Sequence, residues 1–173
     1  MGIPAYYSYL IKNYKKIIIK IKKLNYEIDN FYLDSNSIIY NALENMEGYF
    51  NEEFINRLIK NICLQIDNYI KEIKPKNLVY ISFDGIAPFA KLKQQKERRF
   101  KSKLVTEMLN EIIVEKCSNM FIEKQANIKF DRTCITPGTY FMRQMDKKVN
   151  EFFMGREKIY NINKIIVSTS NER

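Results

Sequence analysis

Two aspartates stand directly after runs of apolar residues. Asp34 follows Phe31-Tyr32-Leu33, and Asp84 follows the longer run from Leu78 to Phe83. The chain contains no His, so carboxylates must carry any acid, base or metal chemistry, and the common His-ligated zinc sites are excluded. Two carboxylates together form a hard oxygen site, which favours Mg²⁺, with Mn²⁺ as the alternative, over zinc.

The two aspartates allow two interpretations. If the apolar runs are neighbouring parallel strands, both acids lie beyond the carboxyl ends of those strands, where ligands bind in open parallel sheets. Divalent cations held there would activate water for attack on a phosphodiester and would stabilise the oxygen that leaves. Alternatively, each Asp only ends a strand and caps the next turn, as Asp84-Gly85 often does. The spacing alone favours this second, structural interpretation.

A second candidate site lies in the basic segment from 91 to 103. Seven of its side chains are basic and one, Glu97, is acidic, which gives a local charge of 7 − 1 = +6. On a helix, at about 100° per residue, four polar side chains share an arc of roughly 100°. These four are Lys91, Gln95, Arg98 and Arg99. Guanidinium forks bind phosphate oxygens in pairs, so this face suits a terminal phosphate; the alternative is a solvated basic face that binds nucleic acid loosely or binds nothing.

Composition restricts the class of protein. The chain has 173 residues, with 29 Lys and Arg against 20 Asp and Glu, so its net charge is 29 − 20 = +9 and nucleic acid is the natural partner. Hydrophobic residues make up 46%, which is enough for a packed core. No apolar stretch approaches the roughly 18 residues of a membrane span. A bias toward Ile, Lys, Asn and Tyr is typical of an A/T-rich genome, a viral one included.

The three cysteines give no sign of a disulfide framework or a zinc ribbon. They lie far apart, are odd in number and form no C-x-x-C pair. This pattern fits a reducing compartment, for which we expect the cytoplasm, with the nucleus as the alternative.

The elements that must position these residues can be predicted from hydrophobic patterns. Apolar runs predict three strands, at 31–33, 78–83 and 165–167. Periodicity predicts an amphipathic helix at 5–23, with a basic side, and helices at 51–74, 91–116 and 137–157. We expect the last of these to begin with Thr136 as its N-cap and Pro137 as its first residue. The stretch 117–135 is either an irregular connection or a short strand. The alternation predicts an α/β fold with a mostly parallel sheet flanked by helices.

Four blocks of this sequence, in order, resemble the XRN-type 5′→3′ exoribonucleases. The blocks cover nearly the whole chain, so the resemblance is far more specific than a single motif. They are Met1-Gly2-Ile3-Pro4-Ala5-Tyr6-Tyr7; Phe31-Tyr32-Leu33-Asp34-Ser35-Asn36-Ser37-Ile38-Ile39-Tyr40; Phe83-Asp84-Gly85-Ile86-Ala87-Pro88 continuing through Lys91 and Gln94-Gln95 to Arg98-Arg99-Phe100; and Phe130-Asp131-Arg132-Thr133-Cys134-Ile135-Thr136-Pro137-Gly138-Thr139.

The resemblance implies a fold and a set of site residues. The fold would be the flap-endonuclease-like, PIN-like α/β nuclease architecture, and Asp34 and Asp84 would be catalytic ligands of Mg²⁺. The 5′-monophosphate of the RNA would bind to the four-residue face described above, that is, to Lys91, Gln95, Arg98 and Arg99. Tyr40 would stack on the first base, in place of the His that is usual in the family, and Asn36 would support the site.

The same resemblance implies that residues 1–173 form a single, partial N-terminal segment of the exonuclease domain, incomplete at its C-terminus. The family continues past this point with a Gly-Glu-Gly-Glu-His segment whose glutamates complete the metal cluster. Two functions follow as hypotheses. The first is a 5′→3′ exoribonuclease that hydrolyses 5′-monophosphorylated single-stranded RNA to nucleoside monophosphates, with the remainder of the nuclease domain as its structural partner. The second is a truncated module that binds RNA 5′ ends without cutting them.

Overall fold

The structure is a computed structural model of the whole chain, and it describes residue 3, residues 5–21, 27–44 and 46, and residues 51–116 and 130–169. Within α4 (Phe89–Lys116) the side chains of Ser102, Thr106, Asn110 and residues 112–116 are not described. Three features of the sequence lie outside the described residues: the Met1, Gly2 and Pro4 part of the first block, Cys117, and the section 117–129 of the uncertain stretch.

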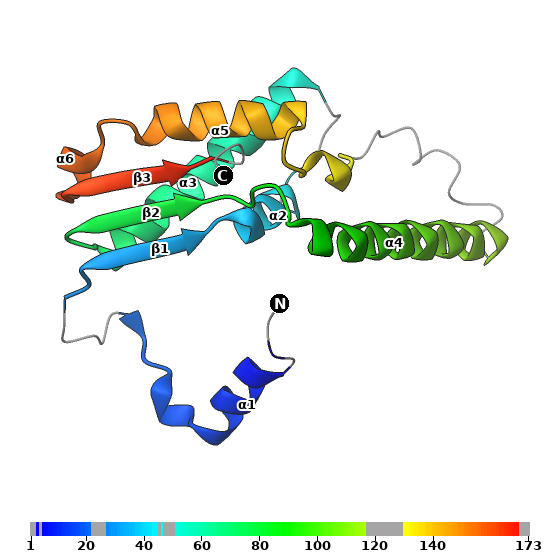
Figure 1. Cartoon of the computed structure of the whole chain (residues 1–173), viewed down its shortest axis with the longest axis horizontal. Helices are drawn as coiled ribbons and strands as arrows, with labels where there is room; N and C mark the ends of the chain where they lie inside the picture. Colours follow the sequence, from blue (N-terminus) through cyan, green and yellow to red (C-terminus); the bar gives the residue numbers. More distant parts are fainter. Residues whose placement is uncertain are drawn as a thin grey trace.

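A parallel three-stranded sheet is the centre of the described structure, as the strand pattern predicts (Figure 1). Its strands are β1 (Asn30–Asp34), β2 (Leu78–Ser82) and β3 (Lys164–Ser168), in the spatial order β1-β2-β3. The register pairs Asp34 with Ser82 and Ser82 with Ser168. All three strands therefore end at one edge of the sheet, and the predicted α/β class is confirmed.

Helices cover one face of this sheet. α3 (Glu52–Ile73) buries an apolar stripe that includes Leu58, Ile62 and Ile66, and it packs against both α2 (Asn36–Glu44) and α5 (Tyr140–Phe153). Val79 and Ile81 of the central strand are fully buried in the same core. The alternate residues of the strands lie on the other face, where the Tyr32 side chain is 65% exposed.

Two elements lie away from this core. α4 extends beyond the carboxyl ends of the strands, and α1 (Tyr6–Asn13), followed by the 3₁₀ helix η1 (Lys15–Ile17), lies apart from the sheet (Figure 1). A second 3₁₀ helix, η4 (Arg132–Cys134), precedes α5, and the short α6 (Glu157–Tyr160) precedes β3. Within the described ranges, none of the helices combines the length and the apolar character that a bilayer-crossing segment requires.

The prediction of one helix over 5–23 is wrong. α1 ends at Asn13 because Tyr14 adopts a non-helical conformation (φ −126°, ψ 61°), and Ile18 is extended. Two causes act together. The β-branched run Ile17-Ile18-Ile19 is a poor helix former, and no core covers this segment, whose Ile17 side chain is 56% exposed. Packing of an apolar face supplies most helical stability in proteins, so the pattern alone is insufficient.

The prediction of a helix over 137–157 is correct in kind but wrong at both ends. Gly138 has φ +86°, a left-handed conformation that a right-handed helix cannot include, so α5 begins only at Tyr140. The N-cap is Thr139, whose hydroxyl accepts a hydrogen bond from the Met142 N–H, and Thr136 is left for another role. At the other end the chain leaves the helix at Met154, before Gly155 with φ +71°.

Candidate functional site

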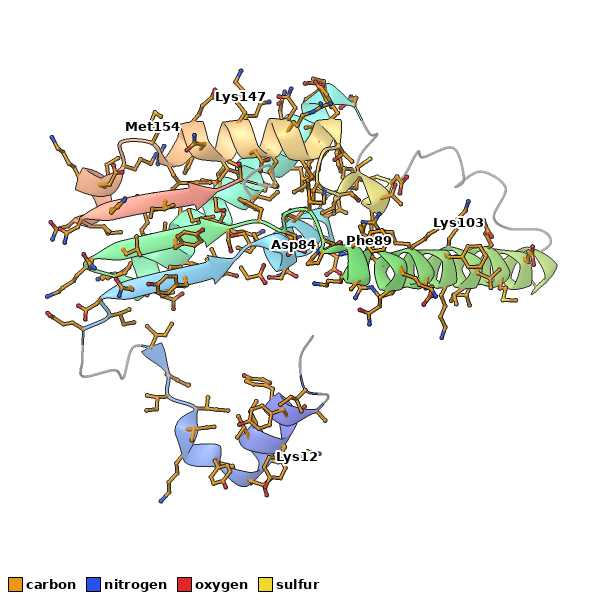
Figure 2. The ribbon with its side chains drawn as sticks, in the orientation of Figure 1. Lys12, Asp84, Phe89, Lys103, Lys147 and Met154 are labelled. Carbon is orange, nitrogen blue, oxygen red and sulfur yellow. The ribbon has the colours of Figure 1, made fainter. Side chains whose placement is uncertain are left out.

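The two candidate metal ligands lie at the same edge of the sheet. Asp34 is the last residue of β1 and is opposite Ser82, the last residue of β2; Asp84 follows Ser82 by two residues. Neighbouring strands are about 4.8 Å apart, so the sheet brings the two positions close together. Figure 2 shows Asp84 between the end of the sheet and the start of α4, which is marked by Phe89. Both aspartate side chains are exposed to solvent.

Backbone and side-chain hydrogen bonds fix the corner that carries these aspartates. The buried Ser35 donates its N–H to the Ser82 carbonyl at 2.8 Å, which continues the pairing of β1 and β2 by one residue. The Ser82 hydroxyl returns a hydrogen bond to the Leu33 carbonyl at 3.1 Å. The Asp84 N–H donates to the Asn36 Oδ1 atom at 3.1 Å. The segment after β2 is therefore tied to the first turn of α2, and the backbone on both sides of the site is held in place.

The carboxylates themselves are free to bind a ligand. Among the described residues, neither the Asp34 nor the Asp84 carboxylate accepts a hydrogen bond or forms an ion pair. The turn-capping alternative is thus not realised in this part of the chain. In type these donors fit Mg²⁺, which proteins commonly bind through one or two carboxylates together with substrate phosphates and water. No third ligand of this kind joins them, since the described residues contain no group of three or more Asp, Glu, Cys or His side chains able to hold a metal.

α2 carries the two other candidate residues of this corner. Asn36 is its first residue and Tyr40 follows one turn later, so the two side chains lie on the same side of the helix. The opposite side is buried through Ile38 and Ala42. Tyr40 is 39% exposed, so part of its side chain is accessible to solvent beside the corner that carries the aspartates. Periodicity did not predict this short helix.

The basic face lies on the first three turns of α4, which begins five residues after Asp84. Lys91, Arg98 and Arg99 are exposed and Gln95 is half-buried. In the part of the chain that the structure describes, no acid forms an ion pair with Lys91, Arg98 or Arg99. From Lys91 to Arg99 the helix rises about 12 Å, so the structure brings the four residues together as one row that starts near the end of the sheet.

The first turn of α4 carries positive charge where a helix least favours it. No acid is present in that turn, although the partial positive charge of a helix N-terminus is stabilised by acidic and destabilised by basic side chains. Lys91 lies there, and Lys93 follows in the next turn. A bound anion would relieve the repulsion between Lys91 and the helix N-terminus.

Sequence reasoning did not identify the partner of Arg99. The Arg99 Nη2 atom donates a hydrogen bond to the Thr136 Oγ1 atom at 2.9 Å. Thr136 belongs to the fourth sequence block and had been assigned only a capping role. The signal was present in that block, which is rich in hydroxyl residues and precedes α5, but nothing in the spacing relates it to a helix 37 residues earlier.

Two groups with clearly shifted pKa values, Asp67 and Tyr160, lie at the opposite edge of the sheet from the two aspartates. Burial alone would raise the pKa of Asp67, but hydrogen bonds from Lys71 and Tyr160 and the positive charges of Lys71 and Arg156 outweigh it and lower the pKa. Burial and the Asp67 hydrogen bond raise the pKa of Tyr160 to about 12. These residues join α3 to α6, near the start of β3. They stabilise the fold far from the two strand-end acids.

Comparison with known proteins identifies relatives of one kind. The family model "XRN 5'-3' exonuclease N-terminus" matches residues 1–173. The chain is similar to 5'-3' exoribonuclease 1 of Saccharomyces cerevisiae, with 34% identity over 166 residues that make up 95% of this chain and 10% of that protein. It is similar to the 5'-3' exoribonuclease 2 homolog of Drosophila melanogaster, with 28% identity in an alignment of 204 positions that covers 99% of this chain and 22% of that protein. For 5'-3' exoribonuclease 1 of Homo sapiens, 30% identity extends over 154 residues, 88% of this chain and 9% of the relative. The chain therefore spans a small fraction of the length of these relatives.

Proposed function

The chain belongs to the XRN 5′-3′ exonuclease family and corresponds to its N-terminal region, and from this premise we propose that it is the first part of a 5′→3′ exoribonuclease. Its substrate would be single-stranded RNA with a 5′-monophosphate, and its products nucleoside monophosphates. We also propose that residues 1–173 are one segment of a larger nuclease domain with a flap-endonuclease-like, PIN-like architecture. We expect this protein to act in a reducing compartment, in the cytoplasm or the nucleus.

One observation carries the proposal: two carboxylates without a partner among the described residues, and a basic row without an ion pair there, lie at the same edge of one sheet. Asp34 ends β1 and Asp84 follows the end of the neighbouring β2 by two residues, and α4 leaves the sheet from the same edge (Figure 1). A nuclease that removes one nucleotide at a time from a 5′ end needs both an anion pocket for the terminal phosphate and a hydrolytic centre one nucleotide away.

Asp34 and Asp84 are the residues that would hold Mg²⁺, or Mn²⁺. The bound cation would activate water and stabilise the charge that develops on the leaving oxygen. The contribution of the chain itself is positional. The Asp84 N–H is bonded to the Asn36 side chain, so the backbone that carries one ligand moves with α2, which also carries Tyr40. We propose that Tyr40 stacks on the first base, since an exposed aromatic ring offers a surface to any base.

The basic row would select the 5′ end. A monophosphate terminus offers more negative charge and a further free oxygen than an internal phosphodiester, and guanidinium groups bind such oxygens in pairs. We propose that Lys91, Gln95, Arg98 and Arg99 form this pocket. A triphosphate or a cap adds bulk as well as charge, so the pocket would exclude both.

The test compares three RNAs of one sequence that differ only at the 5′ end: monophosphate, triphosphate and hydroxyl. The complete reading frame that encodes this chain is incubated with each RNA and Mg²⁺, and decay is followed by gel. The proposal predicts rapid decay of the monophosphorylated RNA, slow decay of the other two, and no decay with Asp84→Ala. Equal decay of all three RNAs, or full activity in Asp84→Ala, would contradict it.

A second function is favoured by the small number of acids at the site. The described residues bring together only two carboxylates, so the segment could bind RNA 5′ ends without cutting them. In that case Mg²⁺ would yield no product from the complete reading frame, while the preference for a 5′-monophosphate in binding would remain. The same three RNAs, used in an equilibrium binding assay, separate this function from the enzyme.

A further inference from the structure

Among the described contacts, Arg99 is the one residue of the basic row whose side chain is held by another element. Its Nη2 atom lies 2.9 Å from the Oγ1 atom of Thr136. Thr136 belongs to the segment from Phe130 to Thr139, which we call the 130–139 turn. This turn connects to α5 and is far from α4 in sequence. An Arg side chain on a helix surface is otherwise mobile, with about 2 kcal/mol of rotamer entropy.

The hydroxyl of Thr136 can only accept the hydrogen bond from Arg99. A threonine hydroxyl has a single hydrogen, and here the Thr136 Oγ1 atom donates to the Thr133 carbonyl at 2.6 Å. Its lone pairs therefore point to the guanidinium. Thr136 is half-buried, and its hydrogen bond with Arg99 lies at the surface. The geometry fixes both the position and the direction of the acceptor.

The 130–139 turn is itself rigidly built. Asp131 caps η4: one carboxylate oxygen accepts the Thr133 N–H at 2.8 Å, and the other accepts the Thr133 hydroxyl at 2.5 Å. The Thr139 hydroxyl lies within hydrogen-bond distance of the Cys134 and Thr136 carbonyls. These contacts link Asp131, Thr133, Cys134, Thr136 and Thr139, so the Thr136 hydroxyl is held by its neighbours in the turn.

The turn is also anchored in the core. Ile135 is buried, with 7% of its surface exposed. The Phe130 ring packs edge-on against Phe141 of α5, with ring centroids 5.3 Å apart. The acceptor for Arg99 is thus fixed relative to the helices that cover the sheet, whereas Lys91, Arg98 and Arg99 of the row are exposed.

We propose that Thr136 is a positioning residue for the 5′-phosphate pocket, an inference that rests on the proposed function. By accepting one N–H of Arg99, Thr136 orders the guanidinium before RNA binds and leaves the other four N–H donors free for phosphate oxygens. An ordered Arg loses less entropy on binding, which increases affinity without an added contact to the ligand. Thr136 would act on the phosphate only through Arg99.

Binding to RNA tests this role with two substitutions at one position. Thr136→Val keeps the shape of the side chain but removes the acceptor, and Thr136→Ser keeps the acceptor. Affinity of the complete protein for 5′-monophosphorylated and 5′-hydroxyl RNA is measured without Mg²⁺. We expect Thr136→Val to weaken binding of the monophosphorylated RNA about tenfold, as for loss of a hydrogen bond to a charged group. Binding of the hydroxyl RNA should not change, and Thr136→Ser should behave as wild type.

A double-mutant cycle separates positioning from a structural role. In the Arg99→Ala background, Thr136→Val should have no further effect on the affinity for monophosphorylated RNA, because its effect passes through the missing guanidinium. An equal loss for both RNAs, or an additive loss in the double variant, would overturn the inference. A wild-type protein that prefers the monophosphate, with Thr136→Val unchanged, would overturn the inference and leave the proposed function intact.

A second measurement does not depend on RNA. In free protein labelled with ¹⁵N, the Nε–Hε signal of Arg99 should show restricted motion in wild type and in Thr136→Ser, and greater motion in Thr136→Val. An Arg99 signal that is equally mobile in all three proteins would overturn the inference. If wild type shows no preference for the 5′-monophosphate, the proposed function fails, and the role of Thr136 in phosphate binding fails with it.

Discussion

Asp84 and Asn36 form the smallest unit of the site that can be tested. The Asn36 Oδ1 atom accepts the Asp84 N–H, so the amide side chain holds the backbone of a candidate metal ligand in place. We therefore expect Asn36→Ala to reduce the hydrolysis rate by about 10–100-fold, the range for loss of a group that orients a ligand. Asn36→Asp should restore much of the rate, because its carboxylate can accept the same hydrogen bond.

The effect of Asn36→Ala is compared with that of Asp84→Asn. Loss of a proposed ligand should reduce the rate by more than the 10–100-fold range, while affinity for monophosphorylated RNA remains near wild type. Rates and affinities of the complete protein are measured in parallel. A hydrolysis rate that is lower for Asn36→Ala than for Asp84→Asn would contradict the proposal that Asp84 is a metal ligand and that Asn36 only positions it.

Asp67 governs a different property, the response of stability to acid. Its pKa lies below the ordinary value because Lys71 and Tyr160 donate hydrogen bonds to the buried carboxylate. A depressed pKa means that the stabilisation is present above the ordinary pKa and is lost as the pH falls through the folded-state pKa. At pH 7 we expect Asp67→Asn to lower the free energy of unfolding by about 1–3 kcal/mol.

The pH dependence is checked by urea unfolding of wild type and Asp67→Asn at pH 7 and at pH 3. The difference between the two proteins should shrink at pH 3, because the stabilisation declines as the pH falls below the ordinary Asp pKa toward the lower folded-state pKa. The conservative variant Asp67→Glu keeps the charge and should show a pH dependence closer to that of wild type. If the difference is the same at both pH values, the charge of Asp67 is not the cause.

At the scale of elements, α3 is the helix on which the core depends, and its start is defined by one side chain. The Asn51 Oδ1 atom accepts the Phe54 N–H at 2.7 Å and so caps the helix. We expect Asn51→Ala to lower the free energy of unfolding by about 0.5–2 kcal/mol. Asn61→Ala, at an exposed position inside the same helix, is the matched control and should change stability by less than about 0.5 kcal/mol.

Asn51→Asp extends this test, because Asp is an equally good N-cap and its charge suits the helix N-terminus. Thermal or urea unfolding of the three variants supplies the measurement. A loss in Asn51→Asp as large as the loss in Asn51→Ala would show that the side-chain cap is not what stabilises this end.

The elements that the sequence predicted well are those with core contacts. The three strands and the long helix α3 follow from apolar runs and periodicity, because their apolar faces are the ones buried at Ile62, Val79 and Ile81. The segment 5–23 was predicted incorrectly as one helix, because its apolar face packs against no core in the described structure. Periodicity alone does not show whether such a core is present. The start of α5 depended on Gly138 with φ +86°, a backbone state that the pattern does not encode.

The candidate site was predictable in its residues but not in its connections. Strand ends place Asp34 and Asp84 at one edge because parallel strands share a direction, and the helical repeat places Lys91 and Arg99 on one face. The hydrogen bonds from Asp84 to Asn36 and from Arg99 to Thr136 join segments 48 and 37 residues apart in sequence. Such pairs depend on the tertiary fold, which no local spacing describes.

At the scale of the whole molecule, charge is the dominant feature. The net charge of +9 predicts that RNA binding weakens as salt increases, with a slope of about −0.7 in log K against log salt for each phosphate contacted by the protein on a single strand. For monophosphorylated RNA, Arg98→Ala should reduce the magnitude of this slope by about 0.7. It should not change the slope for hydroxyl RNA, because Arg98 is assigned to the terminal phosphate.

Lys93→Ala is the matched control for this measurement. Lys93 is an exposed residue of the same first turns of α4, but at about 100° per residue it lies nearly opposite the row. It should leave the difference between the two RNAs unchanged. If Arg98→Ala and Lys93→Ala reduce the two slopes equally, α4 acts as a general basic surface and the 5′-phosphate pocket is not where we propose.

The polarity of degradation tests the central claim most directly, namely that acids at the strand ends and the row on α4 act together on the 5′ end of RNA. The complete protein is given Mg²⁺ and a monophosphorylated RNA whose first nucleotide alone carries a label, and products are separated at the earliest times. We predict that the labelled product is a nucleoside monophosphate from the outset, and that Asp34→Asn and Asp84→Asn form none. Labelled fragments of intermediate length, or label retained on a strand that shortens from its 3′ end, would contradict the claim.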